Sequence, residues 1–145
     1  RVTISDYEAA KGSFDDYVAR SGKSVFTSRD MSALHIWGGI IDRFHVQETK
    51  SFFTSEIHVA RFGDVAIATN PFELFLDYGN RIRARSAATQ TFLIQLACDD
   101  GMYLPTAKAE RGSHYSAYVS SGWTGHEGGE LLVGKTLQVI QEMWS

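Results

Sequence analysis

The chain has a single cysteine, Cys98, among its 145 residues. One cysteine excludes an intrachain disulfide and a C-x-x-C metal site, and it leaves the redox compartment undecided. No apolar run approaches the roughly 18 residues that span a bilayer, so we expect no transmembrane segment. No long basic run is present and the net charge is −3, so we expect no nucleic-acid partner.

The sequence also lacks the marks of a secretory signal. It begins with Arg1 rather than Met, and no basic start is followed by an apolar block. We therefore expect a piece of a longer protein, with the remainder of its own polypeptide as a partner. A content of 43% hydrophobic and 21% charged residues is that of an ordinary globular domain.

The spacing of apolar residues predicts helices first and then a mixture of strands and helices. Apolar steps of three and four indicate a helix over 5–20 and another from Ser28 or Asp30 onward, with Gly38-Gly39 open to close approach by another element. The later predicted elements are a hairpin over 57–67 with its turn at RFGD, a helix over 72–85, a buried strand over 91–98, a short helix from Pro105 to Gly112, an irregular loop over 113–129 with one strand at 115–119, and a helix over 130–144. This order predicts one mixed α/β domain over 1–145, helical over 1–55, with a small sheet covered by helices.

A nucleotide-binding pattern lies near the C-terminus. GELLVGKT fits G-x-x-x-x-G-K-[ST] from Gly129 to Thr136. A working phosphate loop follows a buried strand and opens a helix. Here the middle residues are Glu, Leu, Leu and Val, which continue the apolar period of the final helix, and the WTGHEGG stretch before them is not a strand. We therefore expect a helix with an exposed Lys135 and no bound nucleotide.

Two segments each place a polar side chain beyond the end of a predicted strand. Glu73 follows a strand that ends near Thr69, and Tyr103 follows a strand that ends near Cys98. Ligands bind at the carboxyl ends of strands in α/β sheets, so both side chains would converge on one site if the strands are neighbours. Each residue also has a simpler interpretation. Glu73 suits the first turn of a helix, and Tyr103 suits a half-buried packing position with its hydroxyl bonded to backbone.

Residues 56–144 resemble the second half of the catalytic domain of the neutral ceramidase family, including its bacterial ceramidase-like relatives. The matching residues are Pro71-Phe72-Glu73 after a strand, Gly79-Asn80-Arg81 in the next helix, Tyr103-Leu104-Pro105-Thr106 before another helix, and the Tyr/Gly-rich stretch 113–129 before the closing helix. Two departures are visible: Phe72 stands where the family has glycine, and the loop around Tyr103 is shortened. Residues 1–55 have no clear counterpart.

The resemblance implies a zinc-dependent amidohydrolase that cleaves the amide of an N-acyl sphingoid lipid. In the family two histidines, one glutamate and one tyrosine hold the zinc ion. The glutamate corresponds to Glu73 and the tyrosine to Tyr103, whereas both histidines would lie upstream of Arg1. The chain would then be the C-terminal part of such a hydrolase, inactive alone and extracellular or periplasmic. The alternative is a non-catalytic α/β domain related to the family.

Other candidate residues give weaker signals. The histidines show neither H-x-x-x-H nor H-E-x-x-H spacing, so each is expected to be structural or on the surface. They are His35, His45, His58, His114 and His126. His126 is the exception of interest, because it lies in the Gly-rich loop near where the family's site loop runs. Asp99-Asp100 suit a metal or base pair, or equally a turn, and Cys98 suits a small buried position. No G-x-S-x-G elbow is present, which excludes that serine-hydrolase arrangement.

Overall fold

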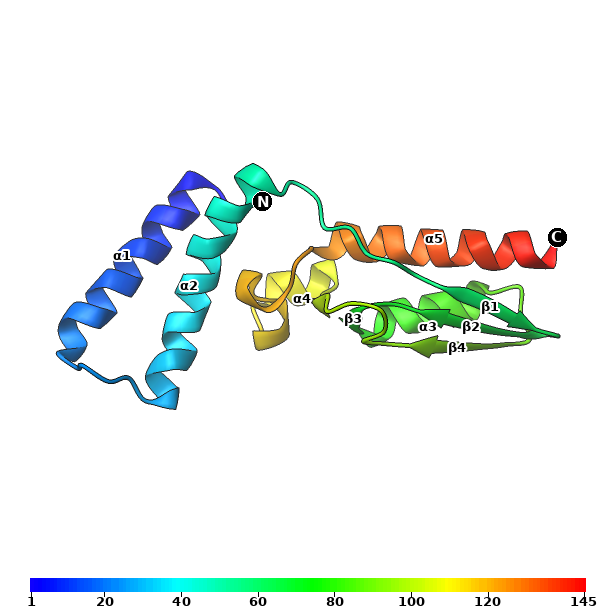
Figure 1. The fold of residues 1–145 in the computed structure, drawn as a ribbon, viewed down its shortest axis with the longest axis horizontal. Helices are drawn as coiled ribbons and strands as arrows, with labels where there is room; N and C mark the ends of the chain where they lie inside the picture. Colours follow the sequence, from blue (N-terminus) through cyan, green and yellow to red (C-terminus); the bar gives the residue numbers. More distant parts are fainter. The chain divides into compact units, whose positions relative to one another are not determined.

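The computed structural model describes the whole chain, Arg1–Ser145, and it has the mixed α/β character that the sequence predicts (Figure 1). The chain divides into two compact units. Unit 1 comprises Arg1–Phe53 and Tyr118–Ser121, and unit 2 comprises Thr54–Ala117 and Gly122–Ser145. None of the helices combines the length and apolar character needed to cross a bilayer.

Unit 1 is a helical hairpin made of α1 (Ile4–Ser21) and α2 (Ser28–Thr49). Each helix begins with a capping box, in which a threonine and the aspartate three residues later each accept a bond from the other's backbone N–H. These bonds satisfy donors that the first turn of a helix leaves free. The predicted helix starts are therefore correct to within one or two residues.

Aromatic side chains join the two helices of unit 1. Tyr7 stacks on Phe44 with ring centroids 4.5 Å apart, and Tyr17 tilts against Trp37 at 5.7 Å. All four belong to the stripes that the periodicity predicts. Met31 has the spacing of the same stripe, but 54% of its surface is exposed, so it lies outside the contact.

The segment Tyr118–Ser121 packs against α2 within unit 1. A Cβ atom at Gly39 would lie 2.1 Å from the Cβ of Ser120, so the predicted close approach at the glycine pair occurs at Gly39. The strand predicted over 115–119 is wrong. Two short 3-10 helices occupy this region instead, η1 (Tyr115–Ala117) and η2 (Val119–Ser121).

The main sheet of unit 2 has the strand order β1-β2-β4. β1 (Val59–Phe62) and β2 (Val65–Thr69) form the predicted antiparallel hairpin. Gly63, with a φ of 57°, supplies the left-handed residue of the turn. β4 (Gln90–Ile94) pairs with β2 in parallel, so the two predicted strands are indeed neighbours.

Two helices pack on this sheet, with α3 (Leu76–Arg85) on β4 and α5 (His126–Trp144) on β1 (Figure 1). Ala66 and Thr91 are buried, whereas Phe92 is 51% exposed. Alternate residues of a strand point to opposite faces. The fully buried strand predicted over 91–98 is therefore wrong in two respects: β4 ends at residue 94, and only one of its faces is covered.

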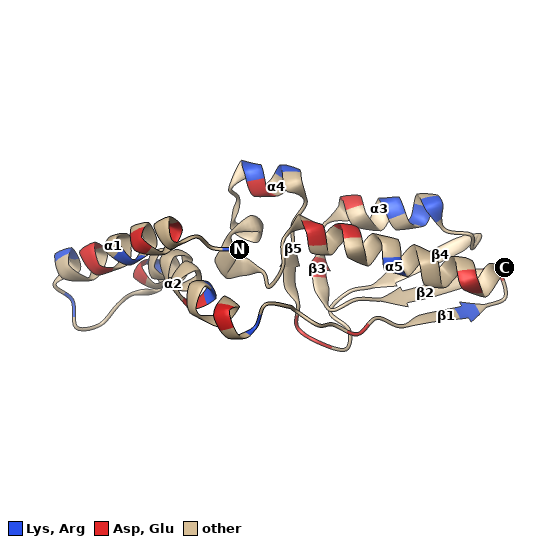
Figure 2. Ribbon diagram, turned by 90° about the horizontal axis from the view of Figure 1, so that it is seen from above, with Lys and Arg blue, Asp and Glu red and all other residues tan.

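A second, two-stranded sheet follows the first. β3 (Phe72–Leu74) and β5 (Met102–Leu104) pair in parallel, and α4 (Ala107–Gly112) comes after β5 (Figure 2). The helix predicted over 72–85 therefore starts four residues late, at Leu76. Asn70 marks the break between the sheets, because its backbone N–H donates to Ile94 O at 2.9 Å and its Oδ1 accepts from the Phe72 N–H at 3.1 Å.

The nucleotide-binding pattern lies entirely inside α5, as expected for residues with a helical apolar period. Lys135 is exposed and its Nζ donates to Gln138 at 3.1 Å. The helix begins at His126, four residues before the predicted start. Gly129 is buried because it faces the ring of Tyr78: a Cβ there would lie 2.2 Å from Tyr78 Cζ.

The two glycines of that pattern provide a matched stability test. Gly129→Ala is expected to lower the free energy of unfolding by about 1–3 kcal/mol, because Tyr78 is only 1% exposed and cannot move aside. A Cβ at Gly134 would have no neighbouring atom within 4 Å, so Gly134→Ala is expected to raise it by about 0.5–1 kcal/mol. Urea denaturation followed by circular dichroism measures both. Equal effects of the two substitutions would contradict this packing.

Candidate functional site

Glu73 and Tyr103 lie directly opposite each other in the two-stranded sheet. β3 and β5 are parallel, and the register pairs Glu73 with Tyr103. Paired residues of adjacent strands point to the same face, with strands about 4.8 Å apart. The sequence predicts that these side chains converge if the two longer strands are neighbours; they lie opposite each other here, although each stands in a short strand that the sequence does not predict.

The pKa of Tyr103 is raised to about 12. Hydrogen bonding of its phenol to Glu73 is the first cause, followed by burial and the charge of Glu73, and Tyr115 acts in the same direction. Tyr103 is thus a neutral phenol that donates to a carboxylate at neutral pH. Glu73 is a strand residue, so the interpretation of it as a first-turn helix acid is wrong.

A close packing contact holds the two strands in this register. The Gly101 N–H donates to Pro71 O at 2.8 Å. A Cβ atom at Gly101 would lie 2.4 Å from the ring of Phe72, which is buried. Phe72 stands where the ceramidase family has glycine, and in this chain the glycine that makes room lies on the neighbouring segment. The departure from the family pattern therefore leaves the Glu73–Tyr103 pairing intact.

The loop before β5 is built by turn chemistry. Asp99 Oδ1 accepts from the Asp100 N–H at 2.8 Å, and Asp100 Oδ1 accepts from the Met102 N–H at 3.1 Å. These bonds support the turn interpretation of the two aspartates. Cys98 is exposed and has a φ of 73°, so the expectation of a small buried residue is wrong.

His126 is bound by Glu110, a contact that the sequence does not predict. The Glu110 carboxylate accepts from the His126 backbone N–H at 2.7 Å and lies 2.6 Å from its Nδ1. The N-cap of α5 is Gly125, which has no side chain, so Glu110 caps the helix from α4. This hydrogen bond is the main cause that raises the pKa of His126. No local pattern links residues that are 16 positions apart.

Tyr78 and Arg81, both on α3, make hydrogen bonds to the first residues of α5. The buried Tyr78 hydroxyl donates to Pro105 O at 2.8 Å and to His126 O at 3.3 Å, and burial is the first cause that raises the pKa of Tyr78 to about 12. Arg81 makes a bidentate pair with Glu130, at 2.7 and 2.5 Å. The arginine of the family-like Gly-Asn-Arg patch is thus engaged in joining α3 to α5.

The donor chemistry of the Glu73–Tyr103 pair fits part of a zinc site. A carboxylate and a phenol oxygen side by side match two of the four ligands that the resemblance implies, and zinc accepts oxygen ligands. No group of three or more His, Cys, Asp and Glu side chains in the chain is arranged to hold a metal ion.

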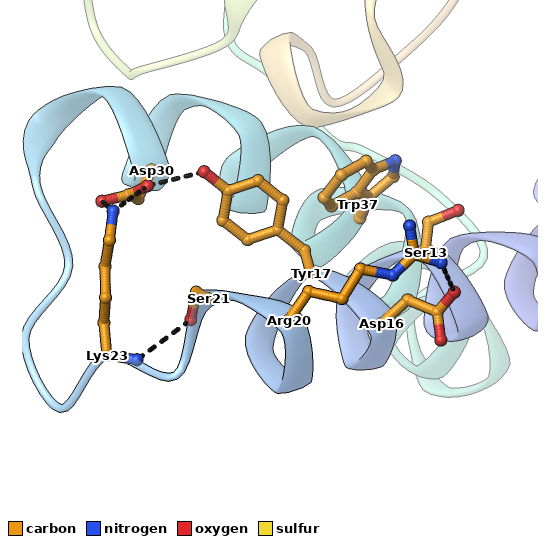
Figure 3. A pocket seen from close by; sticks show the side chains of 8 residues that line it. All are labelled: Ser13, Asp16, Tyr17, Arg20, Ser21, Lys23, Asp30 and Trp37. Atoms are coloured by element: carbon orange, nitrogen blue, oxygen red, sulfur yellow. Dashed lines mark hydrogen bonds and ion pairs between the residues drawn. The ribbon is translucent and has the colours of Figure 1, made fainter.

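Unit 1 contains a separate cavity of about 520 Å³ at the end of its hairpin where the loop connects α1 to α2 (Figure 3). Tyr17 and Lys23 both reach the buried carboxylate of Asp30, at 2.6 and 2.9 Å. Hydrogen bonds from Thr27, Tyr17 and Lys23, in that order, hold the pKa of Asp30 below its ordinary value. Because these partners come from α1, the connecting loop and the cap of α2, the network closes the hairpin.

Comparisons of the chain with known protein families, curated proteins and solved structures find no match. The resemblance to the ceramidase family therefore rests on the motifs themselves. Of these motifs, the pair formed by Glu73 and Tyr103 has the most direct chemical meaning, because the fold brings together two residues that are 30 positions apart.

Replacing Glu73 tests the bond that defines the pair. In Glu73→Gln the pKa of Tyr103 is expected to fall from about 12 toward its ordinary value of about 10, because the negative charge that opposes phenolate formation is gone. A ¹³Cζ-tyrosine NMR titration measures it. A Glu56→Gln control, at a carboxylate with 74% exposed side-chain surface, is expected to leave it unchanged. A pKa near 10 in the unmodified chain would contradict the pairing.

The His126–Glu110 contact predicts a dependence of stability on pH. The folded-state pKa of His126 is raised above the unfolded value of about 6.5. The stabilisation that protonated His126 gives to the folded state is therefore fully present below the unfolded-state pKa. It is lost as the pH rises through the folded-state pKa. The free energy of unfolding is expected to decrease over that range, and His126→Gln is expected to remove this decrease. Urea denaturation at a series of pH values measures it, with the exposed His114→Gln as control. The same slope in both variants would contradict the contact.

Proposed function

We propose that unit 2 is the C-terminal part of the catalytic domain of a ceramidase-like zinc-dependent amidohydrolase. Glu73 and Tyr103 would be two ligands of its zinc ion. One observation supports the proposal: the parallel pairing of β3 and β5 sets these two residues opposite each other on the same face of the small sheet. These are the two positions that the family motifs assign to metal ligands.

The chemistry of the pair is consistent with such a role. Bound zinc would supply Lewis-acid polarisation of an amide carbonyl and a water with a lowered pKa. Glu73 would contribute a negatively charged oxygen, and Tyr103 a neutral oxygen that loses its proton only at high pH or beside a cation. Short strands hold both donors, which makes their placement more rigid than a loop would.

The proposal requires two histidines from outside the chain. His126, the histidine nearest in sequence to the family's site loop, is engaged with Glu110 at 2.6 Å and serves the start of α5. The chain alone would then have no amidase activity, and the partner that completes the site would be the remainder of its own polypeptide. The substrate class would be an N-acyl sphingoid lipid or another amide.

Activity of the full-length polypeptide tests the proposal. We expect zinc-dependent hydrolysis of an N-acyl sphingoid lipid that a chelator abolishes and added zinc restores. Glu73→Gln is expected to lower kcat/KM by at least about 100-fold, because it removes a ligand of the metal and not merely a neighbour of one. The measurement is release of the sphingoid base, with bound zinc quantified in the same samples.

Two controls make this result interpretable. Glu56→Gln changes an exposed carboxylate of the same unit and is expected to retain full activity. Circular dichroism of each variant separates loss of a ligand from loss of the fold. Activity that survives in folded Glu73→Gln, or a full-length protein without zinc, would overturn the proposal and favour the non-catalytic α/β domain.

A further inference from the structure

One face of the three-stranded sheet in unit 2 is apolar and faces away from the helices. On the other face, a Cβ atom at Gly79 of α3 would lie 3.4 Å from Leu93 Cδ1. Arg61 lies on that same face, with its guanidinium 4.3 Å from the ring centroid of Trp144 in α5. Alternate residues of each strand therefore point away from both helices. By the strand register they are Ala60, Phe62, Val65, Ile67, Thr69, Gln90, Phe92 and Ile94, and none of them is charged.

The outer strands carry the most exposed apolar residues of this face. Phe92 and Ile94 of β4 are 51% and 46% exposed, and Phe62 of β1 is 64% exposed. Sheets with parallel strands usually have both faces covered. A contiguous apolar surface that the chain itself leaves exposed is typical of a site where another protein surface binds.

β4 is also an open edge, because the strand order β1-β2-β4 leaves it without a neighbouring strand on one side (Figure 1). The Asn70 N–H bonds to Ile94 O at 2.9 Å, so the backbone of Ile94 faces β2. Backbone groups of successive strand residues alternate in direction, so Thr91 and Leu93 direct their N–H and C=O groups to the open side. An unpaired row of such groups is a template for another strand.

The two edge strands of this sheet differ in how they are protected. Charged side chains, proline and bulges commonly block pairing at an edge. β4 has the sequence QTFLI and pairs with β2 residue for residue, so it has none of the three. β1 carries Arg61, whose guanidinium bonds to the carbonyl oxygens of Gly63 and Met143. β4 is therefore the edge that is open to a partner strand.

A second copy of β4 matches this edge in register. Directly opposite residues of antiparallel strands exchange pairs of backbone bonds. A two-fold axis at Phe92, the middle residue of β4, sets Thr91 opposite Leu93 of the other copy, and Leu93 opposite its Thr91. These are the residues whose backbone groups face outward, so both can exchange their bonds. An uncharged strand needs no partner of opposite charge, which favours another copy of the same strand.

We propose that two copies of the chain associate through β4, antiparallel and centred on Phe92, so that their three-stranded sheets become one continuous sheet. The interface uses the same surface on both copies, as a two-fold dimer requires. The two Phe92 rings meet on the open face, and aromatic pairs on adjacent strands stabilise such pairing. The inference goes beyond the proposed function and is independent of it, since Glu73 and Tyr103 belong to the second sheet.

Sedimentation equilibrium of this chain tests the association. We expect a dimer with a Kd on the order of 10–100 μM, because a pair of five-residue strands lies at the small end of specific interfaces. Phe92→Lys is expected to weaken dimerisation by at least about 10-fold, since it sets like charges opposite each other at the axis. Phe62→Lys changes the same face at the other edge strand and is expected to leave the dimer intact.

Opposite charges distinguish a broken interface from a broken fold. Phe92→Glu alone is expected to be as weak a dimer as Phe92→Lys, whereas an equimolar mixture of the two variants is expected to associate within about 3-fold of the unmodified Kd. An unmodified chain that is monomeric at about 1 mM would overturn the proposal. So would a mixture that does not associate, or a Phe62→Lys variant that loses the dimer as strongly as Phe92→Lys, because whole faces rather than edges would then pack.

Disulfide cross-linking tests the register. In a Cys98→Ser background, which removes the chain's own thiol, Phe92→Cys places two thiols opposite each other. Their Cβ atoms would be about 4.5–5.5 Å apart, close to the separation that a disulfide spans. Ile94→Cys in the same background faces Gln90 of the other copy and is expected to remain uncross-linked. Gel electrophoresis without reductant, after mild oxidation, measures both. Equal cross-linking of the two variants, or none in Phe92→Cys, would contradict the register.

Discussion

The candidate site depends on two chain segments that pair in parallel twice. They pair first as β2 with β4 in the main sheet and, after an interruption, as β3 with β5 in the second sheet. β2 and β4 pair with partners 25 positions apart, as Val65 with Gln90, whereas β3 and β5 pair with partners 30 positions apart, as Phe72 with Met102. Five extra residues, the difference between 30 and 25, therefore loop out of the second segment between the two sheets. Asn70 joins the sheets because its backbone N–H bonds to Ile94 O and its side chain bonds to the Phe72 N–H. Asn70, together with the bond from the Gly101 N–H to Pro71 O, therefore ties the second sheet to the first in the register that places Glu73 opposite Tyr103.

Local patterns in the sequence predict the parts of this arrangement that depend on local interactions. The two helices of unit 1 begin at capping boxes and pack together through side chains at helical spacing, so composition and spacing are enough to place them. The convergence of Glu73 with Tyr103 follows from the general rule about strand ends only when the strands are neighbours. The sequence leaves that condition open, and the pairing of β2 with β4 meets it. The three residues of β3 are different, because a strand this short has no periodicity of its own and exists through its pairing with β5. The start of α5 is likewise set by Glu110, 16 positions away from His126.

At three glycines another side chain packs so closely against the backbone that a Cβ atom would not fit. Gly39 admits Ser120, Gly101 admits the ring of Phe72, and Gly129 admits the ring of Tyr78. Gly129 is also the first letter of the phosphate-loop pattern, and its contact with a buried tyrosine explains the glycine without a nucleotide. The pairing of Gly101 with Phe72 explains how the chain accommodates a bulky buried residue at the start of β3. Neither explanation can be reached from a sequence motif alone, because each contact joins residues that are far apart in the sequence.

The Glu73–Tyr103 bond has a consequence for how a metal would be bound. A donor and an acceptor that satisfy each other avoid the desolvation cost of unpaired polar groups, so the pair is stable with nothing else bound. The same bond keeps the proton on Tyr103, because the carboxylate opposes the charge of a phenolate. A cation at this position would reverse that effect, since its positive charge favours the phenolate and withdraws Glu73 from the phenol. If the proposed zinc ion were bound here, its binding and the ionisation of Tyr103 would be linked.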